Sequence, residues 1–214
     1  MISPGGKGNP WYGVRKFERG RVLKSVFFAF GVSKTIAFSF LAMIPSVGES
    51  QPVQEYRRSA ENLEFPRKAV RAPAFRLEAM DGSQVSLSQF RGQVVILHFW
   101  ATFCAPCGPE MKSLHELQTD PNMKGLQVVT ISIDALDSSV LRFLRERKLH
   151  AFIALRDRSS SLRQAYQVDA LPMSYVIDAS GKIRARMRGA LNWQDPPVRE
   201  FLKKLLEQGF FRLP

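Results

Sequence analysis

The sequence predicts an α/β three-layer sandwich, in which a mixed β-sheet is covered by helices on both faces. Apolar runs of strand length alternate with segments whose apolar residues recur at helical spacing, which is typical of strand–helix–strand units. Near the carboxyl end, residues 182–189 (KIRARMRG) alternate apolar residues with arginines, which indicates an antiparallel strand with one solvated face. A closing amphipathic helix then follows, with apolar residues at Val198, Phe201, Leu202, Leu205 and Leu206.

The length and composition fit one domain with extra segments. The 214 residues are 45% apolar, which supports a buried core, and they carry a formal net charge of +12. Seven Lys/Arg and one acidic residue give +6 over residues 1–48, and 19 basic against 14 acidic residues give +5 over residues 73–214. Nucleic-acid binding needs a dense basic patch with aromatic residues on the folded part, and this distribution predicts none.

Residues 1–48 are interpreted as a basic leader with an apolar stretch. Residues 25–44 have the length of a membrane-spanning helix, but Lys34 would then lie in the bilayer at a cost of about 2.5–3.5 kcal/mol. As a signal peptide, residues 35–44 form the apolar core and residues 46–48 offer small residues for cleavage. Both interpretations place the rest of the chain outside the cytoplasm, so we expect export, by secretion or with an N-terminal membrane anchor.

Residues 49–71 are polar and unpatterned and are interpreted as a linker, and the folded domain is expected over residues 72–211. It opens with an N-terminal β-hairpin extension, because residues 75–80 and 85–87 flank the turn dipeptide Asp81-Gly82. An Arg-Gly turn then leads into Val94–Trp100, an apolar run that predicts a buried strand.

The only two cysteines, Cys104 and Cys107, follow this strand at Cys-x-x-Cys spacing. Met111, Leu114 and Leu117 then recur at helical spacing, so the pair lies where a strand turns into a helix. A helix N-terminus stabilises the thiolate of Cys104, the form that attacks disulfides. We expect Cys104 to be the exposed nucleophile and Cys107, one turn into the helix, to resolve the mixed disulfide. A two-residue loop makes a poor structural staple, and two cysteines exclude a four-thiolate zinc site.

Further strands and helices follow in alternation. Ser138–Leu149 has the pattern of a basic amphipathic helix, and Ala170–Asp178 that of a strand opened by a proline. Residues 182–189 are expected at the edge of the sheet, where the arginines discourage pairing with another chain. The other expected elements are strands at 126–134 and 152–155 and a helix at 162–168.

The stretch WATFCAPCGPEM, the entry hairpin and the segment LPMSYVID together resemble the TlpA-like and ResA-like exported thiol–disulfide oxidoreductases. The resemblance covers about residues 72–211 and implies a thioredoxin-like fold. It also implies protein substrates with disulfides, such as apocytochrome c, and recharging of the cysteine pair by a membrane electron-donor protein. No cofactor is expected beyond the redox-active cysteines themselves.

Two residues are candidates for proton transfer. Glu110 lies three residues after Cys107, on the same helix face, and the resemblance carries onto it a glutamate that ResA-like proteins have near the active site. A carboxylate there could accept and return the proton of a buried thiol; alternatively, Glu110 is a first-turn acid that suits the helix dipole. His98 stands where thioredoxins proper have a buried aspartate, so it is interpreted as a proton relay or as a hydrogen-bonded core residue.

A second group of residues is expected to bind the substrate. The resemblance implies a cis peptide bond at Leu171-Pro172, facing the cysteines, and pairing of the Leu171 backbone with the substrate. Otherwise, Pro172 opens a strand with a trans bond. Gly189 resembles the glycine loop beside the active site and would let a substrate chain approach. Trp100 and Phe103 flank the motif, where an apolar rim would favour docking.

The predicted function is thiol–disulfide exchange with protein substrates outside the cytoplasm, in the reducing direction. Ala105-Pro106, between the cysteines, offers no histidine or charge that would strongly stabilise the reduced thiolate, which favours a reductant. One alternative is a copper-handling module in which the two thiolates and Met111 or Met173 hold Cu(I). The other is a peroxiredoxin-like peroxidase, suggested by the entry hairpin, although the Pro-x-x-x-Thr-x-x-Cys pattern is absent.

Overall fold

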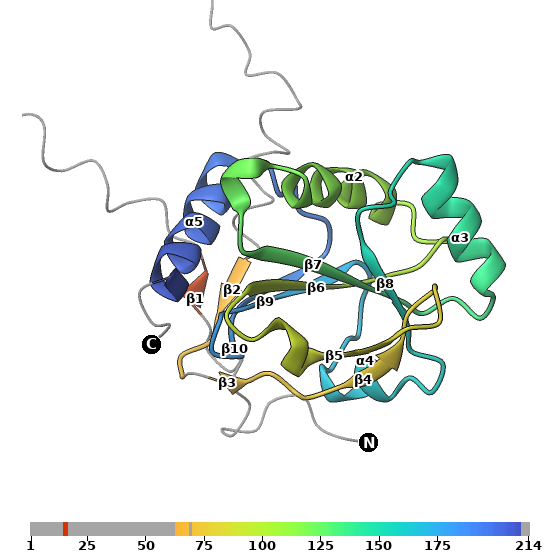
Figure 1. The fold of residues 1–214 in the computed structure, drawn as a ribbon, viewed down its shortest axis with the longest axis horizontal. Helices are drawn as coiled ribbons and strands as arrows, with labels where there is room; N and C mark the ends of the chain where they lie inside the picture. Colours follow the sequence, from red (N-terminus) through yellow and green to blue (C-terminus); the bar gives the residue numbers. More distant parts are fainter. Residues whose placement is uncertain (1–14, 17–62, 69, 211–214) are drawn as a thin grey trace, which may run out of the picture.

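The computed structural model describes residues 15–16, 63–68 and 70–210. Its centre is a sheet with the strand order β1-β2-β10-β9-β6-β7-β8, and β3 pairs with β10 beside this path (Figure 1). The strands of the sheet are Arg15–Lys16 (β1), Leu63–Phe65 (β2), Val70–Arg71 (β3), Val94–Trp100 (β6), Leu126–Ser132 (β7), Ile153–Arg156 (β8), Met173–Ile177 (β9) and Lys182–Arg188 (β10).

The sheet is mixed, as the sequence predicts. β6 pairs in parallel with β7, and β7 with β8, whereas β9 runs antiparallel to both β6 and β10. All seven side chains of β6 are buried, which explains its unbroken apolar run, because a strand with both faces covered has no solvated side. The predicted bounds of this strand are confirmed.

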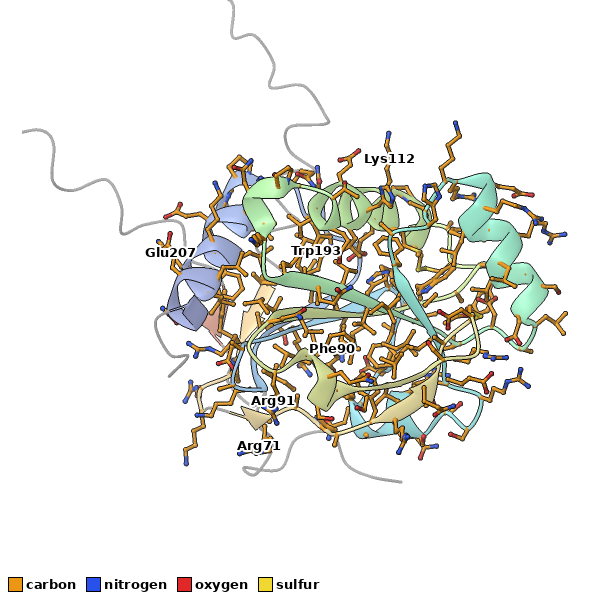
Figure 2. All side chains as sticks on the ribbon, viewed as in Figure 1. Arg71, Phe90, Arg91, Lys112, Trp193 and Glu207 are labelled. Carbon is orange, nitrogen blue, oxygen red and sulfur yellow. A yellow bond between two sulfur atoms is a disulfide. The ribbon has the colours of Figure 1, made fainter. Side chains whose placement is uncertain are left out.

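Helices and a hairpin cover the two faces of the sheet, so the predicted three layers are confirmed (Figure 1). Apolar side chains of α2 and α5 fill the core on one face, and the β4–β5 hairpin, a 3-10 helix and α4 close the other. Trp193 and Phe90, labelled in Figure 2, belong to these two separate cores. These elements are α2 (Cys107–Gln118), α5 (Pro196–Phe210), β4 (Arg76–Glu78), β5 (Gln84–Ser86), the 3-10 helix Leu87–Phe90 and α4 (Ser161–Ala165).

A third, smaller core joins the start of α2 to α3 (Asp137–Glu146). Val140 and Phe143 of α3 pack there with Trp100, Cys107 and Met111. The helix is amphipathic, as predicted, with these apolar residues buried and its arginines exposed. α3 therefore borders the region where the cysteines lie.

The predicted entry hairpin is confirmed. β4 and β5 pair antiparallel on either side of Asp81-Gly82, and Gly82 has φ +87°, a conformation that favours glycine. Ala79 forms a β-bridge with Leu155 of β8, and the N–H of Met80 donates to the carbonyl of Ala154 at 2.8 Å. The hairpin thus runs along the outer side of β8.

β10 was expected at the edge of the sheet, and this expectation is wrong. It pairs with β9 on one side and with β2 and β3 on the other. Its arginines meet acidic side chains of the same chain: Arg186 pairs with Glu64 at 2.6 Å, Arg184 with Asp178 at 3.3 Å, and Arg188 with Asp169. Glu64 lies on β2, so the strand that covers β10 also neutralises one of its charges.

The linker assignment also needs correction. Leu63–Phe65 and Val70–Arg71 were assigned to residues 49–71, yet both pair with β10, and Leu63 is buried in the core. Arg15–Lys16 of the expected leader pair antiparallel with β2. The apolar stretch at residues 25–44 lies outside the described residues, and the part of the chain that the structure describes contains no helix long and apolar enough to cross a membrane.

Candidate active site

The loop between β6 and α2 carries the cysteine pair. Cys104 and Cys107 form a disulfide with their Cα atoms 5.4 Å apart. Cys104 is half-buried, whereas Cys107 is fully buried. α2 begins at Cys107, so the expectation that this cysteine lies one turn into the helix is wrong. Ala105 and Pro106, between the cysteines, form a turn that precedes the helix. In this turn the N–H of Cys107 donates to the carbonyl of Cys104 at 3.1 Å.

A carboxylate at the end of the neighbouring strand holds this loop. Thr102 donates to Asp134 through both its backbone N–H (2.9 Å) and its hydroxyl (2.6 Å). Ser132, the last residue of β7, donates its hydroxyl to the same carboxylate at 2.9 Å. Because β6 and β7 are parallel and end at the same edge of the sheet, Asp134 can reach the loop that leaves β6. The position of Cys104 is thereby fixed by two strands.

Four polar side chains meet in the interior at the first turn of α2. The indole N–H of Trp193 donates to Oε1 of Glu110 at 2.8 Å, and the hydroxyl of Ser174 donates to the same oxygen at 3.3 Å. Nδ1 of His98 lies 2.9 Å from the Ser174 hydroxyl and 3.7 Å from Oε1 of Glu110. The Ser174 hydroxyl thus bridges the imidazole of His98 and the carboxyl of Glu110.

Burial decides the protonation of this cluster. Removal from water raises the pKa of Glu110 from 4.5 to about 8, and the hydrogen bonds from Trp193 and Ser174 offset only part of that effect. Burial lowers the pKa of His98 from 6.5 to about 3. Both groups are therefore neutral at pH 7, and their contact is not an ion pair. A neutral carboxyl gains little from the helix dipole, which argues against a purely capping role for Glu110.

The loop before β9 carries Leu171 and Pro172, which were predicted to bind the substrate. The Leu171-Pro172 peptide bond is cis, as expected. Leu171 is half-buried and packs against the small core that contains Cys107, with Cys104 at its margin. Gly189 donates its N–H to the carbonyl of Pro172 at 2.9 Å, has φ +87°, and has no atom within 4 Å of where a Cβ would stand. The structure therefore brings the Leu171-Pro172 segment and the Gly189 loop to the same end of the sheet.

Only one of the two aromatic residues expected on the docking rim is available there. Phe103 is 74% exposed, but Trp100 is fully buried. The indole of Trp100 packs on Phe143 with ring centroids 4.8 Å apart. The expectation for Trp100 is wrong because β6 is covered on both faces up to its last residue, so Trp100 supports the loop from inside.

Two members of the buried cluster were not found from the sequence. Ser174 faces His98 in the register of β6 and β9, and Trp193 lies in the loop after β10. Neither stands at a recognisable spacing from the cysteines, so only the fold could reveal them. For the copper alternative, Met111 packs in the core with Cys107, whereas Met173 lies in the core on the other face of the sheet. Within the described residues no three His, Cys, Asp or Glu side chains group as metal ligands.

Comparison with known proteins supports the assignment that this geometry suggests. The "Thiol-disulfide oxidoreductase ResA" of Bacillus thuringiensis subsp. konkukian is 30% identical over 152 residues, which are 71% of this chain and 84% of that protein. The ResA of Oceanobacillus iheyensis is 35% identical over 124 residues, 56% of this chain and 64% of that protein. Among solved structures, a "putative Thiol:disulfide interchange protein DsbE" from Chlorobium tepidum has a TM-score of 0.57 at 30% identity and covers 66% of this chain and 96% of its own.

The fold, the cysteine pair and these relatives define an enzyme of the thiol–disulfide oxidoreductase class with a thioredoxin-like fold. A family model described as "AhpC/TSA family" matches residues 69–186, more than half of the chain. The chain belongs to this family, and within it to the ResA-like and TlpA-like thiol–disulfide oxidoreductases.

Proposed function

We propose that this oxidoreductase is an exported reductant of protein disulfides. The observation that carries the proposal is the asymmetry of the cysteine pair, in which Cys104 is reachable and Cys107 is buried one helical turn from a neutral Glu110. A reachable thiolate can attack a substrate, and a buried thiol can release it only after the first attack has occurred.

In the reduced enzyme, the Cys104 thiolate attacks one sulfur of the substrate disulfide and the other substrate sulfur leaves. Cys107 then attacks Cys104 in the mixed disulfide, which frees the second substrate sulfur and forms the Cys104–Cys107 bond. Two electrons have passed from the enzyme to the substrate, and the proton of Cys107 has been lost. Glu110 accepts that proton as Cys107 becomes nucleophilic.

Glu110 then acts as an acid when the enzyme is recharged. The structure contains the oxidised pair, and in this state burial raises the pKa of Glu110 to about 8, so the carboxyl holds a proton at pH 7. When a donor reduces the disulfide, the departing Cys107 thiolate takes this proton, and the negative charge passes to the Glu110 carboxylate, which accepts hydrogen bonds from Trp193 and Ser174. Ser174 and Trp193 hold Glu110 for this transfer, and His98 orients Ser174 through Nδ1.

The substrate docks against the surface around Cys104. The Leu171 backbone pairs with the substrate chain, Gly189 leaves room for it, and the exposed ring of Phe103 supplies apolar contact. The resemblance to ResA-like proteins supports substrates of the apocytochrome c kind and a membrane protein as the electron donor. The basic, apolar leader in residues 1–48 supports export by a signal peptide or an N-terminal anchor.

The deciding experiment is the reduction potential of the cysteine pair in the full chain, measured by equilibration with defined thiol buffers. We expect a value near about −270 mV, as for reducing thioredoxins. A value near about −120 mV would reverse the direction of electron flow, since it belongs to enzymes that introduce disulfides. A fusion to a reporter that is active only outside the cytoplasm tests export separately.

A further inference from the structure

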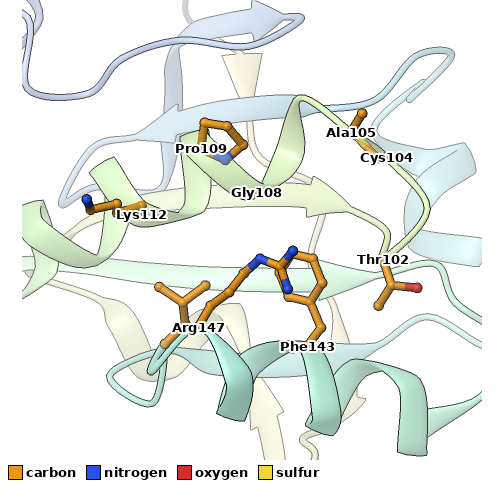
Figure 3. A pocket seen from close by; sticks show the side chains of 9 residues that line it. Thr102, Cys104, Ala105, Gly108, Pro109, Lys112, Phe143 and Arg147 are labelled. Carbon is orange, nitrogen blue, oxygen red and sulfur yellow. The ribbon is translucent and has the colours of Figure 1, made fainter.

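A cavity of about 390 Å³ opens directly beside Cys104, between the start of α2 and α3 (Figure 3). The thioredoxin-like exchange reaction proposed above does not use it. Its size falls within the range of specific ligand sites, and its position gives it access to whatever Cys104 attacks. Its lining residues are Thr102, Cys104, Ala105, Gly108, Pro109, Lys112, Phe143, Arg147 and Leu149.

Apart from the hydroxyl of Thr102, the side chains that line the cavity are apolar or positively charged. Phe143 and Leu149 provide a buried apolar floor, and Lys112 from α2 and Arg147 from the end of α3 bring two positive charges. None of the nine lining residues is acidic. The guanidinium of Arg147 is held over the Phe143 ring, with Cζ 3.9 Å from the ring centroid, so its position is defined by packing.

Carboxylates neutralise several arginines of the described residues, but they do not neutralise these two cations. Arg156, Arg184, Arg186, Arg188 and Arg199 each form an ion pair with a carboxylate of the chain. Within the part of the chain that the structure describes, neither Lys112 nor Arg147 forms an ion pair or a side-chain hydrogen bond. Asp137, at the start of α3, is already bound by Arg156 and Arg158. The cavity therefore presents positive charge that the carboxylates of residues 63–68 and 70–210 do not neutralise.

The wall passes close to the backbone of α2 next to the cysteines. A Cβ at Gly108, the residue after Cys107, would lie 3.7 Å from Nε of Arg147 and 3.8 Å from Cζ of Phe143. The guanidinium thus lies against the residue that follows Cys107 and lines the same cavity as Cys104. A group bound to it would belong to a residue near the cysteine that Cys104 attacks.

We propose that this cavity binds the carboxylate of an aspartate or glutamate that lies close to the target cysteine in the substrate protein. The carboxylate pairs with Arg147 and Lys112, and the side-chain methylenes lie on Phe143 and Leu149. This inference deepens the proposed function and rests on it. The positive cavity would then make Cys104 attack disulfides next to an acidic residue faster than other disulfides.

The test uses three synthetic peptides with the same disulfide, in which the residue beside one cysteine is Glu, Gln or Lys. The reduced full chain is mixed with each peptide, and the rate of exchange is followed. We expect the Glu peptide to react on the order of three- to tenfold faster than the Gln peptide, and the Lys peptide to react more slowly than both. The ratio should fall toward one in 1 M salt, where charges are screened within about 3 Å.

The variant K112Q/R147Q should abolish the preference, whereas the matched control R71Q/K203Q, which removes two exposed charges from β3 and α5, should keep it. Equal rates with all three peptides in the wild type would overturn the inference and leave the exchange function standing. An equal slowing with every peptide in K112Q/R147Q would also overturn it, because the cations would then act on the Cys104 thiolate. A preference for oxidised glutathione without one for the Glu peptide would overturn the inference, because the cavity would then select a small anionic disulfide. Absence of exchange with any peptide would refute the proposed function itself.

Discussion

Replacement of Glu110 by glutamine tests the buried proton most directly. Glutamine keeps the size of the side chain and an oxygen that accepts from Trp193, but it cannot ionise. In the oxidised wild type, burial raises the pKa of Glu110 from 4.5 to about 8. Between these two values the unfolded chain has lost the proton that the folded chain retains, so the free energy of unfolding falls as the pH rises.

The size of the effect follows from the shift. The 2.5 units between the ordinary pKa of 4.5 and pH 7, at about 1.4 kcal/mol per unit, correspond to about 3 kcal/mol. Glu110→Gln should therefore raise the free energy of unfolding of the oxidised protein by up to about 3 kcal/mol at pH 7, with no gain at pH 4. His98 acts in the opposite sense: its pKa of about 3 in the folded state makes stability fall with decreasing pH below 6.5. Of these two groups, only Glu110 makes the free energy of unfolding depend on pH between pH 6.5 and 8.

Urea unfolding of the oxidised wild type and variant at half-unit steps from pH 4 to pH 8.5 measures this difference. Glu116→Gln is the matched control, since Glu116 is an exposed glutamate of the same helix, and it should leave the pH profile unchanged. A wild-type profile that is flat between pH 6.5 and 8, or a Glu110→Gln profile with the wild-type slope, would show that Glu110 is ionised in the folded protein.

Three further outcomes follow from the structure. Glu110→Gln should slow reduction of the disulfide by a small thiol at pH 7 on the order of a hundredfold, because Cys107 leaves without its acid; a stopped-flow rate equal to the wild type would exclude that role. Cys107→Ser should accumulate a mixed disulfide between Cys104 and a substrate cysteine, visible by mass spectrometry under non-reducing conditions, and Cys104→Ser should accumulate none. Leu63→Ala should lower the free energy of unfolding by about 2–5 kcal/mol because the side chain is buried in the core; a change below about 0.5 kcal/mol would place β2 outside the cooperative domain.

The parts of the fold that the sequence could predict are those with a local signal. β6 was bounded correctly because its apolar run is continuous, and the hairpin because Asp81-Gly82 marks its turn. β2 carried no such signal, since a strand of three residues is too short to show alternation. Its pairing with β10 depends on Leu63 and Glu64 meeting residues about 120 positions further along the chain. The error on β10 followed directly from the missed strand.

The candidate site divides in the same way. The cysteines, Glu110 and Pro172 stand in motifs that can be recognised from spacing and neighbours, and the structure brings them to one end of the sheet. The group around Glu110 draws His98, Ser174 and Trp193 from β6, β9 and a loop, so it exists only once the register of β6 and β9 is known. For Trp100 two predictions conflicted, since it ends the predicted buried strand and also stands next to the cysteine motif; the structure confirms its burial.

The entry hairpin and β2 affect how the sheet of this enzyme is protected from unspecific pairing with other chains. Partly unfolded chains carry unsatisfied backbone groups and pair readily with any open strand. In the described part of the chain, Ala79 and Met80 already occupy backbone positions along β8, and β2 with β3 occupies the far side of β10. These backbone groups are therefore not open to pairing with an incoming chain. The hairpin and β2 thus lower the chance of unspecific strand pairing at these two places, while the proposed function needs only the loop of Leu171 and Pro172 to stay open to a substrate.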